Sequence, residues 1–378
     1  MEFCDLKRQY AHLKEKIDSR ISKVMEHGKF INGPEIKELE DKLANFVGVE
    51  FAIGVSSGTD ALLASLIAMN IQRGDYVITT PFSFVASSSM IPFVDAKPIF
   101  VDISPETFNL DAGKLQEFLS NPISPSGRIP LEKIKSILAV DLFGQTADYD
   151  KIREIAKTYG LKIIEDGAQS FGAEYKGRKA CSLGDISATS FFPSKPLGCY
   201  GDGGMVFTND KIIAEKIKLI RKHGQSERYE HTSLGFNMRL DSLQAAVLLA
   251  KLEEFIWKEI EKRRSVAELY NQRLNGIVKT PLISEPNRSV YAQYSILVNN
   301  RDKLKDFLAD SGIPTAIHYP KPLHLQPIFS GLGCKKGDFP VAEDIASRII
   351  SLPIDAYKTE EEINYISDKI KEFANGFS

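Results

Sequence analysis

Apolar residues follow two different periods along the first half of this chain. They recur at helical spacing over 5–27 and 34–47, which predicts two helices at the start. Beyond them, short β-branched runs such as FAIGV (51–55) and LKIIED (161–166) are separated by helical stretches such as DYDKIREIAKTYG (148–160). Strands that alternate with helices in this way form mostly parallel sheets with helices on both faces. We therefore predict an α/β fold.

The pattern changes after Asn209. A helix is predicted over 210–224, and a longer amphipathic helix from about Leu240 to Leu274 is expected to bridge two domains. We predict a large α/β domain with the N-terminal helices over 1–240, and the bridging helix with a small α+β domain over 241–378. The elements predicted for the small domain are a strand over 289–298, a helix over 301–312, a strand over 314–320 and two closing helices.

Composition and charge exclude several classes of function. The 48 basic and 50 acidic residues give a formal net charge of -2, so no overall field attracts nucleic acid or anionic lipid. The longest apolar stretches, such as 245–252, are shorter than the roughly 20 residues that cross a bilayer. The start, MEFCDLKRQY, does not resemble a signal peptide, so we expect a cytoplasmic protein. The cysteines and histidines lack metal-ligand spacing, so no metal site is predicted.

A strand that ends in small residues and passes into a helix, GVSSGTDALL (54–63), is a candidate phosphate site. The free amides at the helix N-terminus, with the hydroxyls of Ser57 and Thr59 beside them, suit a phosphate group. An ordinary capped helix with Asp60 in its first turn explains the same residues. The segment lacks the glycine spacing of P-loops and dinucleotide folds, so neither ATP nor NAD is indicated.

Two further segments place reactive groups after apolar strands. LKIIEDGAQSFGA (161–173) ends its strand in Glu165 and Asp166, where the sheet edge of an α/β fold forms its ligand crevice. Asp166 could equally cap the next helix. In FFPSKPLGCYGDGG (191–204), Lys195 lies between a serine and a proline with four glycines after it, so its amine could form a Schiff base. A solvated loop lysine is the alternative.

Together the three segments meet the requirements of pyridoxal 5'-phosphate (PLP). This cofactor needs an amine for a Schiff base, a carboxylate to keep its pyridine nitrogen protonated, and a helix N-terminus for its phosphate. Phe84 follows another strand in PFSFVASS (81–88), so it could stack on the ring, although core packing explains it equally well.

With these residues assembled, the chain resembles the DegT/StrS family of PLP-dependent nucleotide-sugar aminotransferases over nearly its whole length. The resemblance implies the aspartate-aminotransferase-like type I fold. Five segments in the family's order carry it, namely GTDAL (58–62), EDGAQSFGA (165–173), SFFPSKPLGCYGDGG (190–204), GFNMRLDSLQAAVLLAKL (235–252) and TAIHYPKPLHLQP (315–327).

The resemblance also implies a role for each matching residue. Lys195 would be the Schiff-base lysine and the proton shuttle, Asp166 the partner of the pyridine nitrogen, and Gln169 a neighbour of the ring near its hydroxyl. The phosphate would be held by Gly58, Thr59 and Ser190. Asn237 would reach the phosphate of the neighbouring subunit's cofactor, which implies a homodimer with shared active sites.

At the substrate end, the resemblance points to Arg239, His318 and Tyr319, with residues 29–36 lining the nucleotide entrance. Several segments are most similar to aminotransferases of UDP-2-acetamido-2-deoxy-3-keto-hexuronic acid, which serve surface polysaccharide biosynthesis. In those enzymes the arginine at the position of Arg239 pairs with the sugar carboxylate. A pairing of Arg239 with Asp241 or with a helix terminus is the alternative.

The expected reaction is therefore transamination of a nucleotide-linked 3-keto sugar, with L-glutamate as donor and 2-oxoglutarate as leaving product. An aminotransferase for a dTDP-3-keto-6-deoxyhexose is the first alternative. Family members with histidine at the lysine position are dehydratases, and Lys195 favours transamination instead. A non-catalytic regulator that binds PLP is a further alternative, which the balanced charge and the lack of a DNA-binding motif disfavour.

Overall fold

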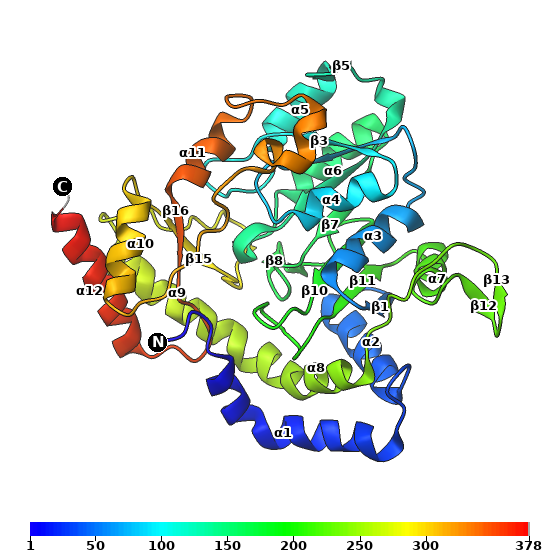
Figure 1. Cartoon of the computed structure of the whole chain (residues 1–378), viewed down its shortest axis with the longest axis horizontal. Helices are drawn as coiled ribbons and strands as arrows, with labels where there is room; N and C mark the ends of the chain where they lie inside the picture. The colour runs from blue at the N-terminus through cyan, green and yellow to red at the C-terminus, as the bar shows by residue number, and fades with distance from the viewer. Residues whose placement is uncertain (377–378) are drawn as a thin grey trace.

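A seven-stranded sheet forms the centre of the protein (Figure 1), described here by a computed structural model that covers residues 1–376. The strand order is β1-β11-β10-β7-β6-β2-β3. Strand β11 is antiparallel to both of its neighbours, and the pairs from β10 to β3 are all parallel. The bounds are β1 (Phe51–Val55), β2 (Tyr76–Thr79), β3 (Lys97–Phe100), β6 (Ile134–Val140), β7 (Lys162–Asp166), β10 (Ile186–Ser190) and β11 (Gly204–Thr208). The predicted mostly parallel sheet is confirmed.

Both faces of the sheet are buried, which is why apolar residues follow one another along its strands, as in ILAV of β6, instead of alternating with polar ones. In β7, Ile164 packs into the cluster that includes residues of α3, α4 and α7, whereas Ile163 packs into the cluster with α5 and α6. Successive residues of a strand point to opposite faces, so helices must cover both. These helices are α3 (Gly58–Ala68), α4 (Ala86–Phe93), α5 (Ala112–Ser120), α6 (Tyr149–Tyr159) and α7 (Lys211–Ile220).

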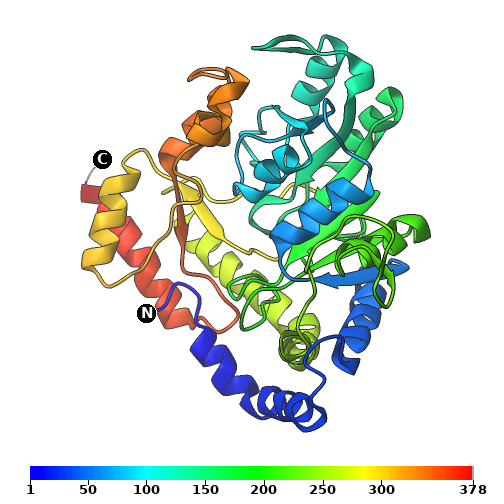
Figure 2. The same cartoon turned by 45° about the vertical axis from the view of Figure 1, so that its right-hand side comes forward.

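The N-terminal helices are α1 (Leu6–His27) and α2 (Pro34–Val47), as the sequence predicts. Their ends follow from local chemistry. Helix α2 begins at a proline, which needs no backbone N–H in the first turn, and stops at Gly48 with a left-handed φ of 82°. Figures 1 and 2 show α1 running alongside α8 at the outer side of the molecule.

The predicted bridging helix is present as α8 (Ser242–Glu254) and α9 (Ile260–Leu274), with a π-helical turn, η3 (Phe255–Glu259), between them. Helix α8 packs on α1 and α2, whereas α9 packs on α12. The helix thus spans from the central sheet to the C-terminal elements. The proposed division of the chain at residue 240 stays a prediction.

The C-terminal part pairs β15 (Tyr294–Leu297) with β16 (Ile349–Leu352) and adds α10 (Arg301–Asp310), α11 (Pro340–Arg348) and α12 (Glu360–Gly376). Residues of α9, α10, α12 and both strands share one apolar cluster. The predicted strand over 314–320 is wrong, because only Ala316 forms an isolated bridge, with Ser351. The strand predicted over 289–298 is only β15, since a positive φ of 46° at Tyr291 interrupts the extended backbone.

The remaining elements are short. The minor strands are β4 (Ile123–Ser124), β5 (Gly127–Arg128), β8 (Glu174–Tyr175), β9 (Arg178–Lys179), β12 (Gln225–Glu227), β13 (Glu230–His231) and β14 (Asn287–Arg288). The hairpin of β12 and β13 projects from the body beside α7 (Figure 1). Over residues 1–376, none of the helices has both the length and the apolar character that crossing a bilayer requires.

Candidate active site

The predicted site residues gather where strands β1, β7 and β10 end. These strands run in the same direction, so their carboxyl ends meet at one edge of the sheet. Register places Gly204, the first residue of β11, between Val55 and Ser190, and it pairs Ala188 with Asp166. Crevices at this edge are the usual ligand sites of α/β sheets.

The N-terminus of α3 packs directly against the end of β10. A Cβ atom on Gly58 would lie 2.6 Å from Ser190 Cβ, so only glycine permits this approach. Ser57 caps the helix, because its Oγ accepts a hydrogen bond from Asp60 N at 3.0 Å. The amides of Gly58 and Thr59 have no acceptor within the described chain. The predicted helix cap is thus present, and these two amides are also free to bind an anion.

Lys195 occupies a tight turn between β10 and β11. Its backbone N–H donates to Phe192 O at 2.8 Å. A Cβ on Gly198 would lie 2.4 Å from Pro193 O, so the turn closes on itself at this glycine. Burial lowers the pKa of the Lys195 amine, while the negative charge of Asp166 opposes that shift. A larger neutral fraction makes this amine a better nucleophile than a solvated lysine.

Asp166 is the buried carboxylate that faces Lys195. Burial raises its pKa, whereas hydrogen bonds and the charge of Lys195 lower it. Ser87 Oγ donates to Asp166 Oδ2 at 2.7 Å, and Ala168 N donates to Oδ1 at 3.2 Å. Asp166 does not cap a helix, so the structure excludes that alternative for its sequence position. The neighbouring Glu165 is also buried but accepts the amides of Cys181, Leu183 and Gly184, which gives it a structural role.

Gln169, Phe84, His318 and Tyr319 surround the same edge. Gln169 Oε1 accepts Phe143 N at 2.9 Å, and its Nε2 donates to Tyr319 Oη at 3.1 Å. The ring of Phe84 lies 6.3 Å from that of Tyr319 and its side chain is 53% exposed, so core packing does not account for it. Burial, with the charge of Lys195, lowers the pKa of His318 to about 4, so the imidazole is neutral at pH 7.

Asn237 and Arg239 are not brought into hydrogen-bond contact with these residues. Asn237 is exposed, in the segment that follows the β12–β13 hairpin. Arg239 is partly buried, and its Nε has no hydrogen-bond partner among residues 1–376. The alternative pairing of Arg239 with Asp241 is absent from that part of the chain. A buried N–H without an acceptor is costly, so this guanidinium is suited to an external anion.

Sequence reasoning missed Ser87, which donates to the Asp166 carboxylate. Ser83 Oγ lies 3.0 Å from Ser87 Oγ, so the two hydroxyls form a chain that ends on the carboxylate. Ser87 lies in the first turn of α4 and Ser83 lies in the segment before that helix, so helical spacing does not relate them. Nothing in the sequence indicates that Ser87 meets the end of β7.

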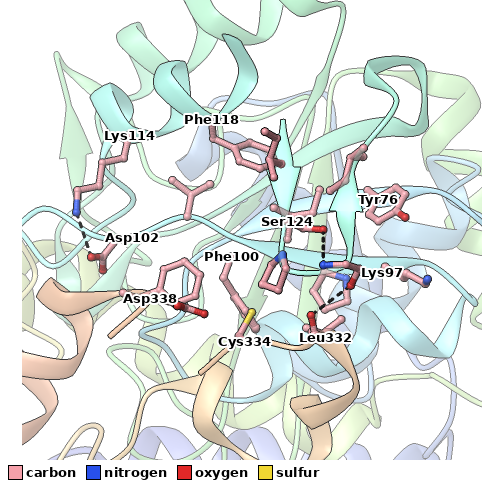
Figure 3. A pocket seen from close by; sticks show the side chains of 18 of the residues that line it. Tyr76, Lys97, Phe100, Asp102, Lys114, Phe118, Ser124, Leu332, Cys334 and Asp338 are labelled. Carbon is pink, nitrogen blue, oxygen red and sulfur yellow. Dashed lines mark hydrogen bonds and ion pairs between the residues drawn. The ribbon is translucent and has the colours of Figure 1, made fainter. Parts of the chain in front are cut away.

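A separate cavity of about 630 Å³ lies along β3 (Figure 3) and contains none of the predicted site residues. The charged pair in this cavity, Lys114 and Asp102, has a structural role. Lys114 Nζ lies 3.1 Å from Asp102 Oδ2, and the same carboxylate accepts the amides of Val341 and Ala342 at 3.0 Å each. Asp102 therefore joins the end of β3 to α5 and to the first turn of α11. The candidate reactive groups, Lys195 and Asp166, lie instead at the sheet edge where β7 and β10 end.

Comparisons with known proteins agree with this geometry. The model of the DegT/DnrJ/EryC1/StrS aminotransferase family matches residues 11–371. The UDP-2-acetamido-2-deoxy-3-oxo-D-glucuronate aminotransferase of Pseudomonas aeruginosa is 46% identical over 97% of this chain and 98% of that protein. The pleiotropic regulatory protein of Geobacillus stearothermophilus is 42% identical over 99% of this chain and 98% of its own.

Solved structures share the whole fold. A DegT/DnrJ/EryC1/StrS aminotransferase from Brucella abortus has a TM-score of 0.93 and 41% identity, with 99% of both chains covered. A Bacillus subtilis protein crystallised with bound cofactor PMP has a TM-score of 0.86 and 29% identity, with 96% of this chain and 82% of that chain covered. The predicted type I fold is confirmed. This chain belongs to the DegT/DnrJ/EryC1/StrS aminotransferase family.

Proposed function

We propose that this protein transfers an amino group from L-glutamate to the 3-keto group of UDP-2-acetamido-2-deoxy-3-keto-glucuronic acid, with PLP as cofactor. The observation that carries the proposal is that Lys195, an amine with a lowered pKa, faces the buried carboxylate of Asp166 beside the open N-terminus of α3. The products are a 3-amino sugar for a surface polysaccharide and 2-oxoglutarate.

The residues at the sheet edge fit PLP. The free amides of Gly58 and Thr59 suit its phosphate, the carboxylate of Asp166 suits its ring nitrogen, and Phe84 offers an exposed aromatic face. The Bacillus subtilis relative holds PMP, the amino form of the same cofactor. When bound, PLP supplies an aldehyde that condenses with amines and a ring that accepts an electron pair.

The chain's own residues bind, orient and move protons. Lys195 Nζ takes a proton from the α-carbon of glutamate in the first half-reaction and returns one to C3 of the sugar in the second. Its lowered pKa suits this task, because a base needs a neutral fraction near the working pH. The carboxylate of Asp166 would stabilise the positive charge of the protonated ring nitrogen. The hydrogen bond between Gln169 and Tyr319 fixes the position of both side chains in the site.

Arg239 is the residue that we assign to the carboxylate of the sugar. Its buried Nε has no acceptor within the described chain, and a planar guanidinium matches a planar carboxylate in two parallel hydrogen bonds. The Pseudomonas aeruginosa relative is named for a glucuronate substrate, which supports the same assignment. A neutral 6-deoxy sugar has no group for this arginine.

The protein is proposed to work as a homodimer with shared active sites. Large apolar side chains are exposed near the site and the hairpin, as a surface that another copy covers would have. They are Phe30, Ile31, Phe192, Leu234 and Phe236. Asn237 lies in the same region and is free to reach a partner subunit's phosphate. Light scattering gives the oligomeric state, and a hybrid of Lys195→Ala and Asn237→Ala chains tests whether sites are shared.

The test of the reaction is incubation of the purified protein with PLP, L-glutamate and one keto sugar at a time, followed by mass spectrometry of the sugar. The three sugars are the UDP-linked uronic acid, its neutral counterpart with a hydroxymethyl group, and a dTDP-linked 3-keto-6-deoxyhexose. We expect an amine product from the uronic acid. An amine product from the dTDP sugar alone would establish the first alternative, and loss of a hydroxyl without gain of an amine would indicate a dehydratase.

Two variants sharpen the experiment. Lys195→Ala should abolish turnover of every sugar. Arg239→Leu should lower kcat/KM for the uronic acid by roughly 10- to 100-fold, because a charge-assisted pair is lost, and should leave the neutral counterpart nearly unchanged. Equal losses on both sugars would contradict the role of Arg239. Binding of PLP with no turnover of any sugar would favour a regulator.

A further inference from the structure

The turn that holds Lys195 rests on two side chains of α8 that take no part in the chemistry described above. We propose that Gln244 and Lys251, the α8 anchor pair, are positioning residues that hold the loop over 191–203 so that the Lys195 amine stays at the reaction centre. The inference rests on the proposed function of Lys195.

Both members of the α8 anchor pair contact the backbone of this loop. Lys251 Nζ donates to Gly198 O at 2.5 Å and lies 4.7 Å from the centre of the Tyr200 ring. Gln244 Oε1 accepts Tyr200 N at 2.9 Å. The two side chains are seven residues apart on α8, and therefore on the same helix face.

The contact with Gly198 is transmitted directly to Lys195. The Cα of Gly198 packs so closely that an added Cβ would lie 2.4 Å from Pro193 O and 2.8 Å from Phe192 O. Phe192 O also accepts the backbone N–H of Lys195 at 2.8 Å. A shift of the Gly198 carbonyl therefore moves the same peptide groups that hold the backbone of Lys195, because close-packed backbone transmits displacement.

The burial of Lys251 has a cost that packing alone does not require. Its side chain is 1% exposed, and Gly198 O is its hydrogen-bond acceptor in the described chain. Burial lowers the pKa of Lys251 to about 8, against the opposing charge of Glu259. An apolar side chain of similar length would avoid the desolvation of an ammonium group. The amine is thus explained by its contact with the loop.

Helix α8 is a rigid support for this contact. Between the two anchors, Val247 and Ala250 pack with Leu13 and Ile17 of α1 in one apolar cluster, and Tyr200 of the loop packs against this cluster. The loop itself has no helix or strand between β10 and β11. Within the loop, backbone hydrogen bonds such as that from Cys199 N to Phe191 O hold the turn. Side-chain contacts fix the turn to its surroundings, and the α8 anchor pair supplies two of them.

The test compares Lys251→Met with Lys358→Met in the full-length protein. Lys358 is the control, since it is also a buried lysine whose Nζ donates to a backbone carbonyl, that of Glu2 at 2.7 Å. It differs from Lys251 in an added ion pair with Asp355 Oδ2 at 3.3 Å, so its replacement should cost at least as much stability. Three quantities are measured: amide hydrogen exchange over 191–203, the rate of borohydride-trapped labelling of Lys195 by PLP, and kcat and KM. Two further variants are included. Lys251→Arg keeps a hydrogen-bond donor at position 251, and Gln244→Ala removes the hydrogen bond to Tyr200 N.

We expect Lys251→Met to raise amide exchange in the loop, slow the labelling of Lys195 and lower kcat by roughly 10- to 100-fold with little change in KM. Lys251→Arg should restore part of the loss, and Gln244→Ala should show the same changes more weakly. Lys358→Met should lower thermal stability without these changes. If Lys251→Met fails to fold, Gln244→Ala carries the test.

The inference is overturned if the Lys251→Met and Lys358→Met proteins differ only in stability, or if Gln244→Ala leaves exchange and labelling as in the wild type. Failure of the proposed function has a different signature. In that case the wild-type protein itself shows no labelling of Lys195 by PLP, while amide exchange still reports whether the α8 anchor pair holds the loop.

Discussion

Replacement of Ser87 by alanine removes one of the two hydrogen bonds that the Asp166 carboxylate accepts from the chain. The bond is 2.7 Å long, and both residues are buried, at 1% and 5% exposure. A hydrogen bond to a charged acceptor contributes about 1.5–3 kcal/mol. The Ala168 amide and the charge of Lys195 remain, so we take the lower end, which corresponds to a loss of roughly tenfold in kcat/KM.

The pH dependence gives a second readout with a defined sign. The Ser87 hydroxyl lowers the pKa of Asp166, so its removal raises that pKa further above the ordinary carboxyl value. Asp166 must be ionised to stabilise the positively charged ring nitrogen of PLP, so activity is lost as pH falls through the pKa of Asp166. The acidic limb of the kcat/KM profile should therefore move to higher pH in Ser87→Ala, and Ser87→Thr should restore it.

Ser88→Ala is the matched control for this experiment. Ser88 is the next residue of α4, it is fully buried, and its Oγ has no hydrogen-bond partner among residues 1–376. Both variants remove the same atom from a buried site, but only one loses a contact with Asp166. Equal kcat/KM values and pH profiles for the two variants would refute the role of the hydrogen bond.

Three further predictions concern cofactor binding and stability. Gly58→Ala should weaken PLP binding about tenfold in a fluorescence titration, because its Cβ would lie 2.6 Å from Ser190 Cβ and displace the α3 N-terminus. Phe84→Ala should also weaken binding yet change the free energy of unfolding by less than about 0.5 kcal/mol, since the side chain is 53% exposed. Burial lowers the pKa of His318 from 6.5 to about 4, so between these pH values the folded cofactor-free protein binds fewer protons than the unfolded chain and loses stability as pH falls. Denaturant unfolding at pH 7 and pH 5 should show a smaller loss for His318→Gln.

Periodicity and capping predicted most of the fold because these signals are local. Helix α2 has the predicted bounds, since Pro34 and Gly48 mark its ends chemically. Strand β16 was missed, because it follows α11 immediately with no turn residue between them. The failed strand over 314–320 has the β-branched composition of a strand, but its backbone finds a partner only at Ala316. Pairing depends on tertiary contacts that composition does not encode.

The site could be predicted as far as strand ends and glycine spacing reveal it. Lys195, Asp166 and Gly58 follow separate strands, and parallel strands bring such residues to one edge. The residues behind them were not predictable, because their partners are distant in sequence. Ser87 is 79 residues from Asp166, and Lys251 is 53 residues from Gly198. From the sequence alone, Ser87 and Lys251 cannot be distinguished from other residues of their helices.

Burial is the largest influence on the pKa of both central groups, and charge opposes it in both cases. Burial alone would make both Asp166 and Lys195 neutral, whereas their mutual attraction favours the charged forms. The carboxylate has Ser87 and the Ala168 amide to stabilise its charge. The Lys195 amine has no acceptor for its protons within the described chain. The chain thus offers hydrogen bonds that stabilise the charge of the carboxylate and none that stabilise the charge of the amine, so the amine readily gives up its proton, as proton transfer next to an electron-accepting ring requires.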